Sequence, residues 1–212
     1  IIEAYQQFEA IARKEKIERV LKSRQPDLTV VFENIHDPHN VSAILRTCDA
    51  VGILETYLLY THTTYPKLGK KSSASAKKWI NQKRFNDYDK IKAHLKQKDF
   101  TIYATHVDPE AKPIFEADWT KPSAIILGNE HLGVSEEALS IADERIYIPQ
   151  TGFIQSLNVS VAGAIILYEA FRQRNDKGLY DSVTLEAEEY QFLFDKWAAN
   201  KKYKMKDHSN ES

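Results

Sequence analysis

Apolar runs alternate with stretches of helical periodicity along most of this chain. Runs bounded by polar residues predict buried strands, and apolar positions that recur every three or four residues predict helices. Strands that alternate with helices are typical of a parallel sheet covered by helices on both faces, so we expect an α/β fold. The predicted strands are 28–32, 56–60, 100–105, 123–128 and 146–149, and the predicted helices are 3–24, 40–50, 88–98, a helix beginning at Ser135, 156–174 and a C-terminal helical part.

The second predicted helix starts after a polar loop. Asn40 is a suitable N-cap for it, and Gly52 lies just past its end, where glycine commonly stops a helix. Ser42, Arg46 and Asp49 are expected on the face opposite to its buried stripe.

The predicted helix 156–174 carries polar residues at its start. We expect Ser156 to cap it, because a hydroxyl can accept hydrogen bonds from N–H groups that the first turn leaves without partners. Gly163 lies in the middle, where glycine costs about 1 kcal/mol relative to alanine, so a close neighbour is expected there. Such a helix start can bind a polar ligand, although an ordinary capped core helix explains the same residues.

Composition excludes several classes of protein. The chain has 212 residues, of which 42% are hydrophobic, as expected of a large folded domain with extensions. Its one cysteine excludes a disulfide framework and a cysteine-based zinc site, and fits a reducing cytoplasm. No apolar run is as long as a membrane span, and no His, Asp and Glu cluster has ligand spacing. We therefore expect a cytoplasmic protein with no membrane association and no metal.

The charges are segregated although the net charge is −1. Basic residues gather in 13–24, 67–98 and 196–206, while acidic residues gather in 130–144 and 181–189. Such segregation can give a neutral protein one face that binds a polyanion. Solvated helix faces explain any one of these clusters equally well.

Candidate binding residues follow the predicted strands. Ligands of parallel sheets bind at the carboxyl ends of the strands, where this chain places Asn40, Thr105 and His106, Gly128 to Glu130, and Gly152 to Asn158. The chain lacks a glycine-rich dinucleotide fingerprint, a P-loop and a serine nucleophile elbow, which argues against NAD, ATP and a serine hydrolase.

Three segments resemble the motifs of the SpoU (TrmH) family of SPOUT-class RNA 2′-O-ribose methyltransferases. They are Asn40–Gly52, Ile126–Gly133 and Ile148–Ala162, and their order and spacing extend the resemblance over 28–174. Within the family, the chain is most similar to the tRNA (guanosine-18-2′-O)-methyltransferases. The resemblance implies three parts: a basic N-terminal helical extension (1–26), a SPOUT methyltransferase domain (27–174), and a C-terminal helical extension with a basic tail (175–212).

The family fold implies more than the pattern does. Its C-terminal part is tied into a deep trefoil knot, an exception to the rule that chains avoid knots. S-adenosylmethionine lies bent among the knotted loops, so the cofactor pocket should include Thr105, Gly128, Ile148 and Leu157. Family members form homodimers through their knotted helices, which would explain small residues around Gly163.

The resemblance also implies an activity, the transfer of a methyl group to a guanosine ribose 2′-oxygen of tRNA. Arg46 is the candidate base and Asn40 positions it, while Glu130, Ser156 and Asn158 orient the ribose and the loop. A guanidinium pKa above about 12 makes proton acceptance difficult, so a substrate phosphate beside Arg46 could take or share the proton. The basic N-terminal helix, residues 67–84 and the C-terminal tail would bind tRNA phosphates.

Three alternatives remain open from the sequence. The same chemistry could act on another tRNA nucleotide or on ribosomal RNA. The fold could also belong to an RNA-binding protein without catalysis, although the joint presence of Asn40, Arg46, Glu130, Ser156 and Asn158 argues against that.

Overall fold

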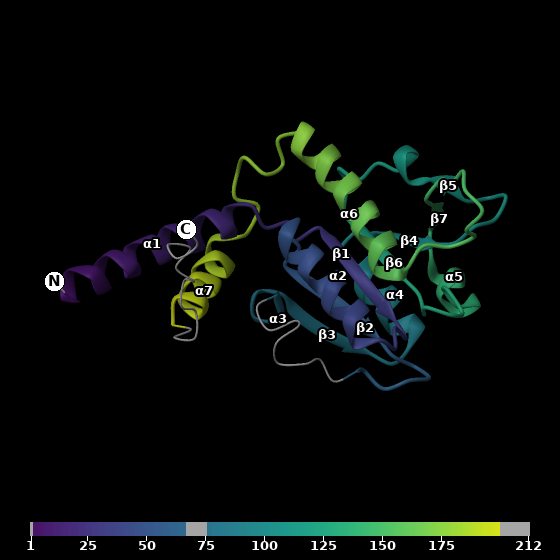
Figure 1. Ribbon diagram of the computed structural model, residues 1–212, viewed down its shortest axis with the longest axis horizontal. Helices are drawn as coiled ribbons and strands as arrows, with labels where there is room; N and C mark the ends of the chain where they lie inside the picture. Colours follow the sequence, from purple (N-terminus) through teal and green to yellow (C-terminus); the bar gives the residue numbers. More distant parts are fainter. Residues whose placement is uncertain (1, 67–75, 200–212) are drawn as a thin grey trace. The chain divides into compact units, whose positions relative to one another are not determined.

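The computed structural model describes residues 2–66 and 76–199 (Figure 1). The chain divides into two compact units, one formed by 25–181 and the other by 1–24 together with 182–212. The basic positions at 67–75 and 200–206 lie outside the described residues.

A parallel sheet forms the centre of the larger unit. Within the described residues it has seven strands, in the order β3-β2-β1-β6-β4-β7-β5. The five predicted strands are confirmed, whereas β3 and β5 were missed, because β3 is a polar edge strand and β5 has two residues. The strands are β1 (Leu28–Glu33), β2 (Glu55–Leu59), β3 (Asn81–Phe85), β4 (Thr101–Thr105), β5 (Lys112–Pro113), β6 (Ser123–Leu127) and β7 (Glu144–Tyr147).

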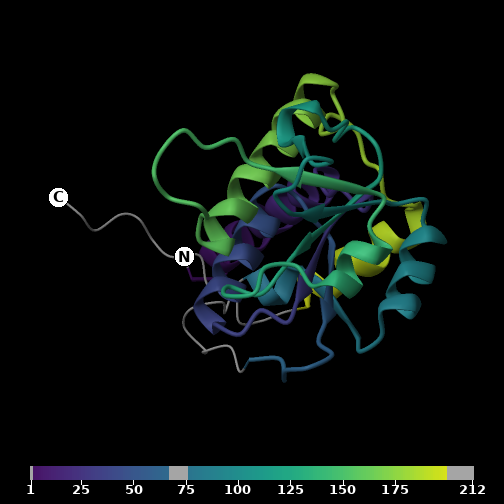
Figure 2. The same cartoon turned by 90° about the vertical axis from the view of Figure 1, so that its right-hand side faces the viewer.

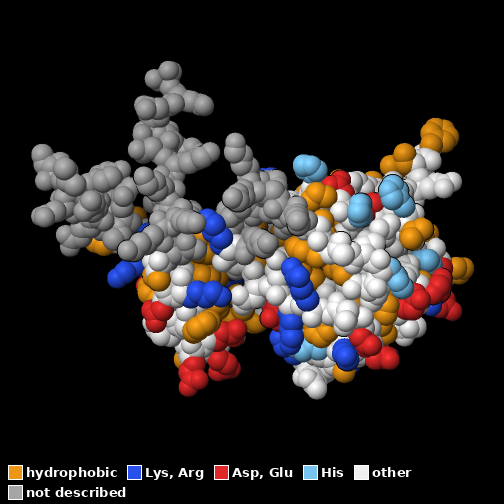
Figure 3. Space-filling model, turned by 90° about the horizontal axis from the view of Figure 1, so that it is seen from below, with side chains coloured by type: hydrophobic (Ala, Val, Ile, Leu, Met, Phe, Trp, Pro, Cys, Tyr) orange, Lys and Arg blue, Asp and Glu red, His pale blue; other side chains and the backbone are white. Residues whose placement is uncertain are grey.

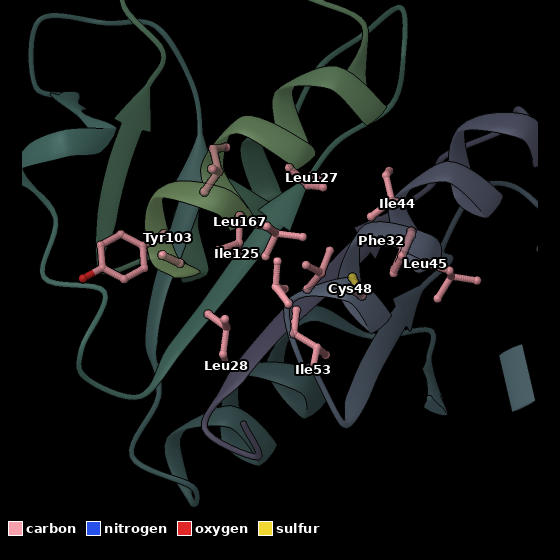
Figure 4. Close-up of a cluster of buried hydrophobic side chains, with 14 of the residues drawn as sticks. Leu28, Phe32, Ile44, Leu45, Cys48, Ile53, Tyr103, Ile125, Leu127 and Leu167 are labelled. Carbon is pink, nitrogen blue, oxygen red and sulfur yellow. The ribbon is translucent and has the colours of Figure 1, made fainter. Parts of the chain in front are cut away.

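Helices cover both faces of the sheet, which confirms the expected α/β architecture (Figures 1 and 2). One face packs against α2 and α6, where Ile44, Leu127 and Leu167 meet in a single apolar cluster (Figure 4). The other face packs against α4 and α5. The helices of this unit are α2 (Pro38–Ala50), α3 (Ala76–Trp79), α4 (Tyr88–Lys96), α5 (Glu136–Ile141) and α6 (Val159–Asp176), with a 3-10 turn η1 (Ile114–Glu116).

The start of α2 differs from the prediction. Its N-cap is Asp37, whose carboxylate accepts a hydrogen bond from the N–H of His39 at 2.8 Å. Pro38 occupies the first helical turn, where its fixed φ is favourable and its missing N–H costs nothing. Asn40 therefore lies inside the helix and is not its cap. Ser42 is buried instead of exposed.

The start of α6 also differs from the prediction. The N-cap is Asn158, whose Oδ1 accepts hydrogen bonds from the N–H of Ser160 at 2.8 Å and from its hydroxyl at 2.6 Å. Ser156 precedes the helix and is exposed, so its hydroxyl does not cap α6. By contrast, Ser135 caps α5 as predicted, accepting from the N–H of Ala138.

Gly163 lets α6 approach the sheet closely. A Cβ atom at this position would lie 2.9 Å from Leu127 Cδ1 and 3.7 Å from Ile44 Cγ1. The expected close neighbour is therefore confirmed. Because both contacts come from the same chain, packing within one subunit accounts for this glycine, and dimer packing is not needed to explain it.

The smaller unit contains two described helices, α1 (Ile2–Lys22) and α7 (Ala187–Ala198). The guanidinium of Arg24 lies 5.2 Å from the ring centre of Trp197, and Arg13 Nη2 donates to the Trp197 carbonyl at 3.0 Å. These two arginines are therefore part of the packing within this unit.

Arg174 fixes the C-terminal half of α6. Its side chain is fully buried, and its Nε donates to the carbonyl of Trp119 at 2.8 Å. Its two terminal nitrogens donate to Asp27 Oδ1 at 2.6 Å, to the Lys121 carbonyl at 2.9 Å and to Gln25 Oε1 at 2.9 Å. One cation thus joins α6 to the segments that precede β1 and β6.

We expect Arg174→Met to lower the free energy of unfolding by about 3 kcal/mol, because it leaves a carboxylate and buried carbonyl groups without their donor. Arg172→Met is the matched control. That side chain is exposed and forms a surface pair with Asp176, and such pairs contribute little. It also pairs with Glu169, which keeps a hydrogen bond from Gln173 when the arginine is removed. Chemical denaturation measures both variants, and equal midpoints would contradict the role of Arg174.

Candidate functional site

A pocket opens at the carboxyl ends of β4, β6 and β7. Its volume is about 410 Å³, and we call it the Gly128 pocket. All four residues predicted to bind a cofactor, Thr105, Gly128, Ile148 and Leu157, line it. Of the predicted catalytic residues, Glu130 and Ser156 also line it, and the lining is completed mainly by apolar side chains and backbone.

The loop after β6 is folded tightly against itself. Asn129 and Gly133 exchange two backbone hydrogen bonds of 2.9 Å. A Cβ atom on Gly128 would lie 2.3 Å from the backbone of Gly133, so any side chain at this position would force the loop to move. Gly133 itself has φ of +70°, which glycine adopts without strain. The wall of the pocket is therefore partly backbone without side chains, which a ligand can approach closely.

A chain of hydrogen bonds joins three segments beside the pocket. Asn40 Nδ2 donates to Glu130 Oε1 at 3.1 Å, and Asn158 Nδ2 donates to Asn40 Oδ1 at 3.1 Å. The backbone N–H groups of His36 and Asp37 donate to the two Glu130 oxygens at 3.1 and 2.9 Å. The structure thus brings together three of the five predicted catalytic residues.

The Glu130 carboxylate is stabilised in its charged form. Partial burial opposes ionisation, but the hydrogen bonds from Asn40, His36 and Asp37 together keep its pKa below the usual value. Since the pKa is lowered, Glu130 is a carboxylate at neutral pH and accepts hydrogen bonds only. It orients its donors and is not an acid that supplies a proton.

Arg46 lies on α2 away from this group. Six helical residues advance about 9 Å and turn about 600°, so Arg46 points about 120° away from Asn40 around the helix. Its side chain is exposed and does not line the Gly128 pocket. Within one chain, the structure therefore does not bring Arg46 to the other predicted catalytic residues.

Thr105 and Ser156 differ in the availability of their hydroxyls. Thr105 Oγ1 donates its proton to the Ile126 carbonyl at 3.2 Å. This hydrogen bond links β4 to β6, so the hydroxyl can act towards a ligand only as an acceptor. Ser156 is exposed at the pocket, in the loop 148–158 that arches away from the sheet (green in Figure 2). Its hydroxyl is available to a ligand.

Two backbone groups at the site were not identified from the sequence. They are the N–H groups of His36 and Asp37, which hold Glu130. Their position in the loop that follows the predicted strand 28–32 is the signal that could have indicated them, whereas the use of backbone groups leaves no trace in residue type. His106, expected at the end of a strand beside Thr105, does line the pocket.

Neither a metal centre nor a membrane span is found in the described part of the chain. There, no three His, Cys, Asp or Glu side chains are grouped so as to hold a metal ion. None of the helices described there combines the length and apolar character needed to cross a bilayer.

The chain is similar to known RNA-modifying proteins. It is 50% identical to the tRNA (guanosine(18)-2′-O)-methyltransferase of Thermus thermophilus over 88% of this chain and 95% of that protein. Its fold matches the solved A. aeolicus TrmH/SpoU tRNA modifying enzyme with a TM-score of 0.84 and 40% identity, over 92% and 99% of the two chains.

A more distant structure is the SpoU methyltransferase AviRb from Streptomyces viridochromogenes in complex with AdoMet. Its TM-score is 0.66 at 26% identity, covering 72% of this chain and 62% of that one. A sequence profile of the SpoU rRNA Methylase family matches residues 27–168, which include the Gly128 pocket and the Glu130 hydrogen bonds. This chain therefore belongs to the SpoU methylase family.

Proposed function

We propose that this chain transfers a methyl group from S-adenosylmethionine to the 2′-oxygen of a tRNA ribose, that of guanosine 18 in the D loop. The observation that carries the proposal is the 50% identity to the Thermus enzyme of that specificity over nearly its whole length. The Gly128 pocket beside an ordered polar group supports it, because methyl transfer needs a donor site and an oriented acceptor.

The Gly128 pocket fits S-adenosylmethionine. The wall formed by Gly128 and Gly133 has no side chains and lets a ligand approach the backbone closely, and Ile148 and Leu157 provide apolar contact for an adenine ring. The cofactor supplies an electrophilic methyl group on a sulfonium. The residues proposed to hold it are Thr105, Gly128, Ile148 and Leu157.

The polar residues are proposed to orient the acceptor ribose. Ser156 presents its hydroxyl at the pocket, while Glu130 and Asn158 fix Asn40 from two sides. The 2′-hydroxyl must lose its proton as its oxygen takes the methyl group. Arg46 is proposed to act here together with a substrate phosphate, since a guanidinium stays protonated and the phosphate can share the proton.

Exposed basic side chains are proposed to bind tRNA phosphates. On α1, Lys14, Arg19 and Lys22 are exposed. Figure 3 shows other Lys and Arg side chains (blue) on one face of the larger unit. Arg24 is buried and does not contribute. Binding through such contacts weakens as salt concentration rises, because each contact releases counterions.

We propose that the chain works as a homodimer in the cytoplasm. Hydrophobic side chains are exposed on α6 and on the loop before it: Phe153 is fully exposed, Ile154 is 61% exposed and Tyr168 is 54% exposed. A second copy of the chain would cover these exposed apolar side chains.

We also propose that residues 27–174 form the methyltransferase domain, flanked by the extensions 1–26 and 175–212, and that its C-terminal part is a trefoil knot. One feature supports the knot. The helix α6 follows β7, yet Gly163 packs against β6 and α2. The chain after β7 therefore returns past the tight loop that follows β6, which is the segment through which it would be threaded.

The direct test is methyl transfer from labelled S-adenosylmethionine to unmodified tRNA, with the modified nucleotide mapped. We expect label on guanosine 18, and none on a tRNA with 2′-deoxyguanosine at that position. Label on another tRNA nucleotide or on ribosomal RNA would show that the chain is a methyltransferase with a different substrate nucleotide. Cofactor binding without any transfer would indicate an RNA-binding protein instead of an enzyme.

Arg46→Ala should lower kcat about 100-fold or more, the range expected when a group that assists proton transfer is lost. Binding of S-adenosylmethionine should be unchanged, because Arg46 does not line the Gly128 pocket. Arg172→Ala, another exposed arginine, is the control and should keep full activity. Methylation by Arg46→Ala at the normal rate would exclude the proposed role.

Glu130→Gln should lower kcat about 10- to 100-fold with little change in fold. Both carboxylate oxygens accept hydrogen bonds, so an amide nitrogen in either orientation would face another donor. Glu137→Gln, an exposed change on α5, is the control. The hydrogen bonds of the Glu130 carboxylate also contribute to the free energy of unfolding. Because they lower the pKa of Glu130 in the folded protein, this contribution is complete above the ordinary pKa of about 4.3 and is lost as pH falls through the lower folded-state pKa.

A wild-type rate for Glu130→Gln at neutral pH would show that the ordered donors do not matter for catalysis.

A further inference from the structure

A second pocket lies at the carboxyl ends of β2 and β3, neighbouring strands at one edge of the sheet (Figure 1). Its volume is about 420 Å³, and we call it the Tyr65 pocket. Tyr60 directly follows β2 and Asn86 directly follows β3. None of its described lining residues is shared with the Gly128 pocket; they are Leu58, Tyr60, Tyr65, Arg84, Phe85 and Asn86.

The walls of the Tyr65 pocket are aromatic and cationic. The rings of Tyr60 and Tyr65 meet edge to face, with centres 5.3 Å apart at 90°. The guanidinium of Arg84 lies over the Tyr65 ring at 5.2 Å, and Gln82 Nε2 donates to the Tyr65 hydroxyl at 3.4 Å. These contacts fix a guanidinium beside aromatic rings before any ligand binds, which suits a planar ligand that carries a negative charge.

The remaining polar chemistry of the pocket favours a nucleotide. The exposed amide of Asn86 offers a donor and an acceptor, as recognition of a base edge requires. The described residues that line the pocket include no Asp or Glu, so no carboxylate there repels a phosphate. Stacking on aromatic rings combined with a cation is the usual way in which proteins bind an unpaired nucleotide.

The Tyr65 pocket is linked directly to the proposed site of methyl transfer. The Tyr60 hydroxyl donates to the Ile35 carbonyl at 2.9 Å, and the next residue, His36, donates its N–H to Glu130. Burial raises the pKa of Tyr60, and the Glu130 charge adds to this, as expected of groups that lie near each other. Both pockets open at the carboxyl edge of one parallel sheet.

We propose that the Tyr65 pocket binds one nucleotide of the RNA substrate other than the methylated one, with its base against Tyr60 and Tyr65 and its phosphate on Arg84. The proposal rests on the function proposed above. An RNA strand that lies along the carboxyl edge of the sheet would place one ribose at Glu130 and a flanking nucleotide in the Tyr65 pocket. The pocket would then help to select which ribose reaches the cofactor.

The test is the steady-state methylation of unmodified tRNA by Tyr65→Leu and Arg84→Gln. We expect each variant to raise KM for tRNA about tenfold, with kcat and the Kd for S-adenosylmethionine unchanged, since stacking and phosphate contacts act on substrate binding. Tyr65→Phe keeps the ring and should retain a normal KM. Arg84→Gln should also reduce the salt dependence of tRNA binding by about one phosphate contact, a slope change of about 0.7 to 0.9.

Lys92→Gln, which removes an exposed cation on α4, is the matched control. It should change neither KM for tRNA nor the salt dependence of tRNA binding. Melting curves establish that the variants are folded. A normal KM for both folded variants overturns the inference and leaves the methyltransferase proposal intact. A lower kcat in both Tyr65→Leu and Tyr65→Phe also overturns it, because that result indicates a structural role for Tyr65.

If the wild-type chain transfers no methyl group, the function proposal fails, and the Kd for unmodified tRNA then decides on the pocket. A tenfold weaker Kd in Tyr65→Leu and Arg84→Gln supports the nucleotide site, and an unchanged Kd overturns it.

Discussion

The Glu130 carboxylate is the centre on which the carboxyl edge of the sheet is organised. It receives hydrogen bonds from the segment after β1, through His36 and Asp37, and from Asn40 in α2. Asn40 in turn receives one from Asn158 at the start of α6. Because one charged group satisfies donors from separate segments, none of these segments can shift without leaving a polar group unpaired. The shape of the Gly128 pocket depends on this arrangement.

Contacts along its whole length position α6. Asn158 attaches its first turn to Asn40, Gly163 allows close contact with Leu127, and Arg174 holds its last turns to the segments before β1 and β6. A helix fixed at both ends can follow an exposed loop without losing its position. This explains how the loop 148–158 can be open enough to admit ligands while the residues on either side of it stay ordered.

The sequence predicted the strands better than the helix starts. Buried strands such as β1 and β6 are continuous apolar runs, whereas the edge strand β3 is polar because it need not be buried on both faces. At the helix starts, Asp37 and Asn40, or Ser156 and Asn158, satisfy the same local capping rule. Tertiary contacts decide between them: Asn40 binds Glu130, and Ser156 faces the pocket. Asn40 and Ser156, which the sequence predicted as helix caps, therefore belong to the site instead.

The motifs located the candidate site residues, but their assembly followed from the fold. Asn40 and Glu130 are far apart in the chain and meet only because β1 and β6 are adjacent parallel strands. Arg46 shows the limit of the same reasoning, because it shares a motif and a helix with Asn40 yet points away from it. Within one chain, a guanidinium outside the pocket can serve methyl transfer only through a group placed between the two. A phosphate of bound RNA has the charge for that position, so the substrate itself would complete the site.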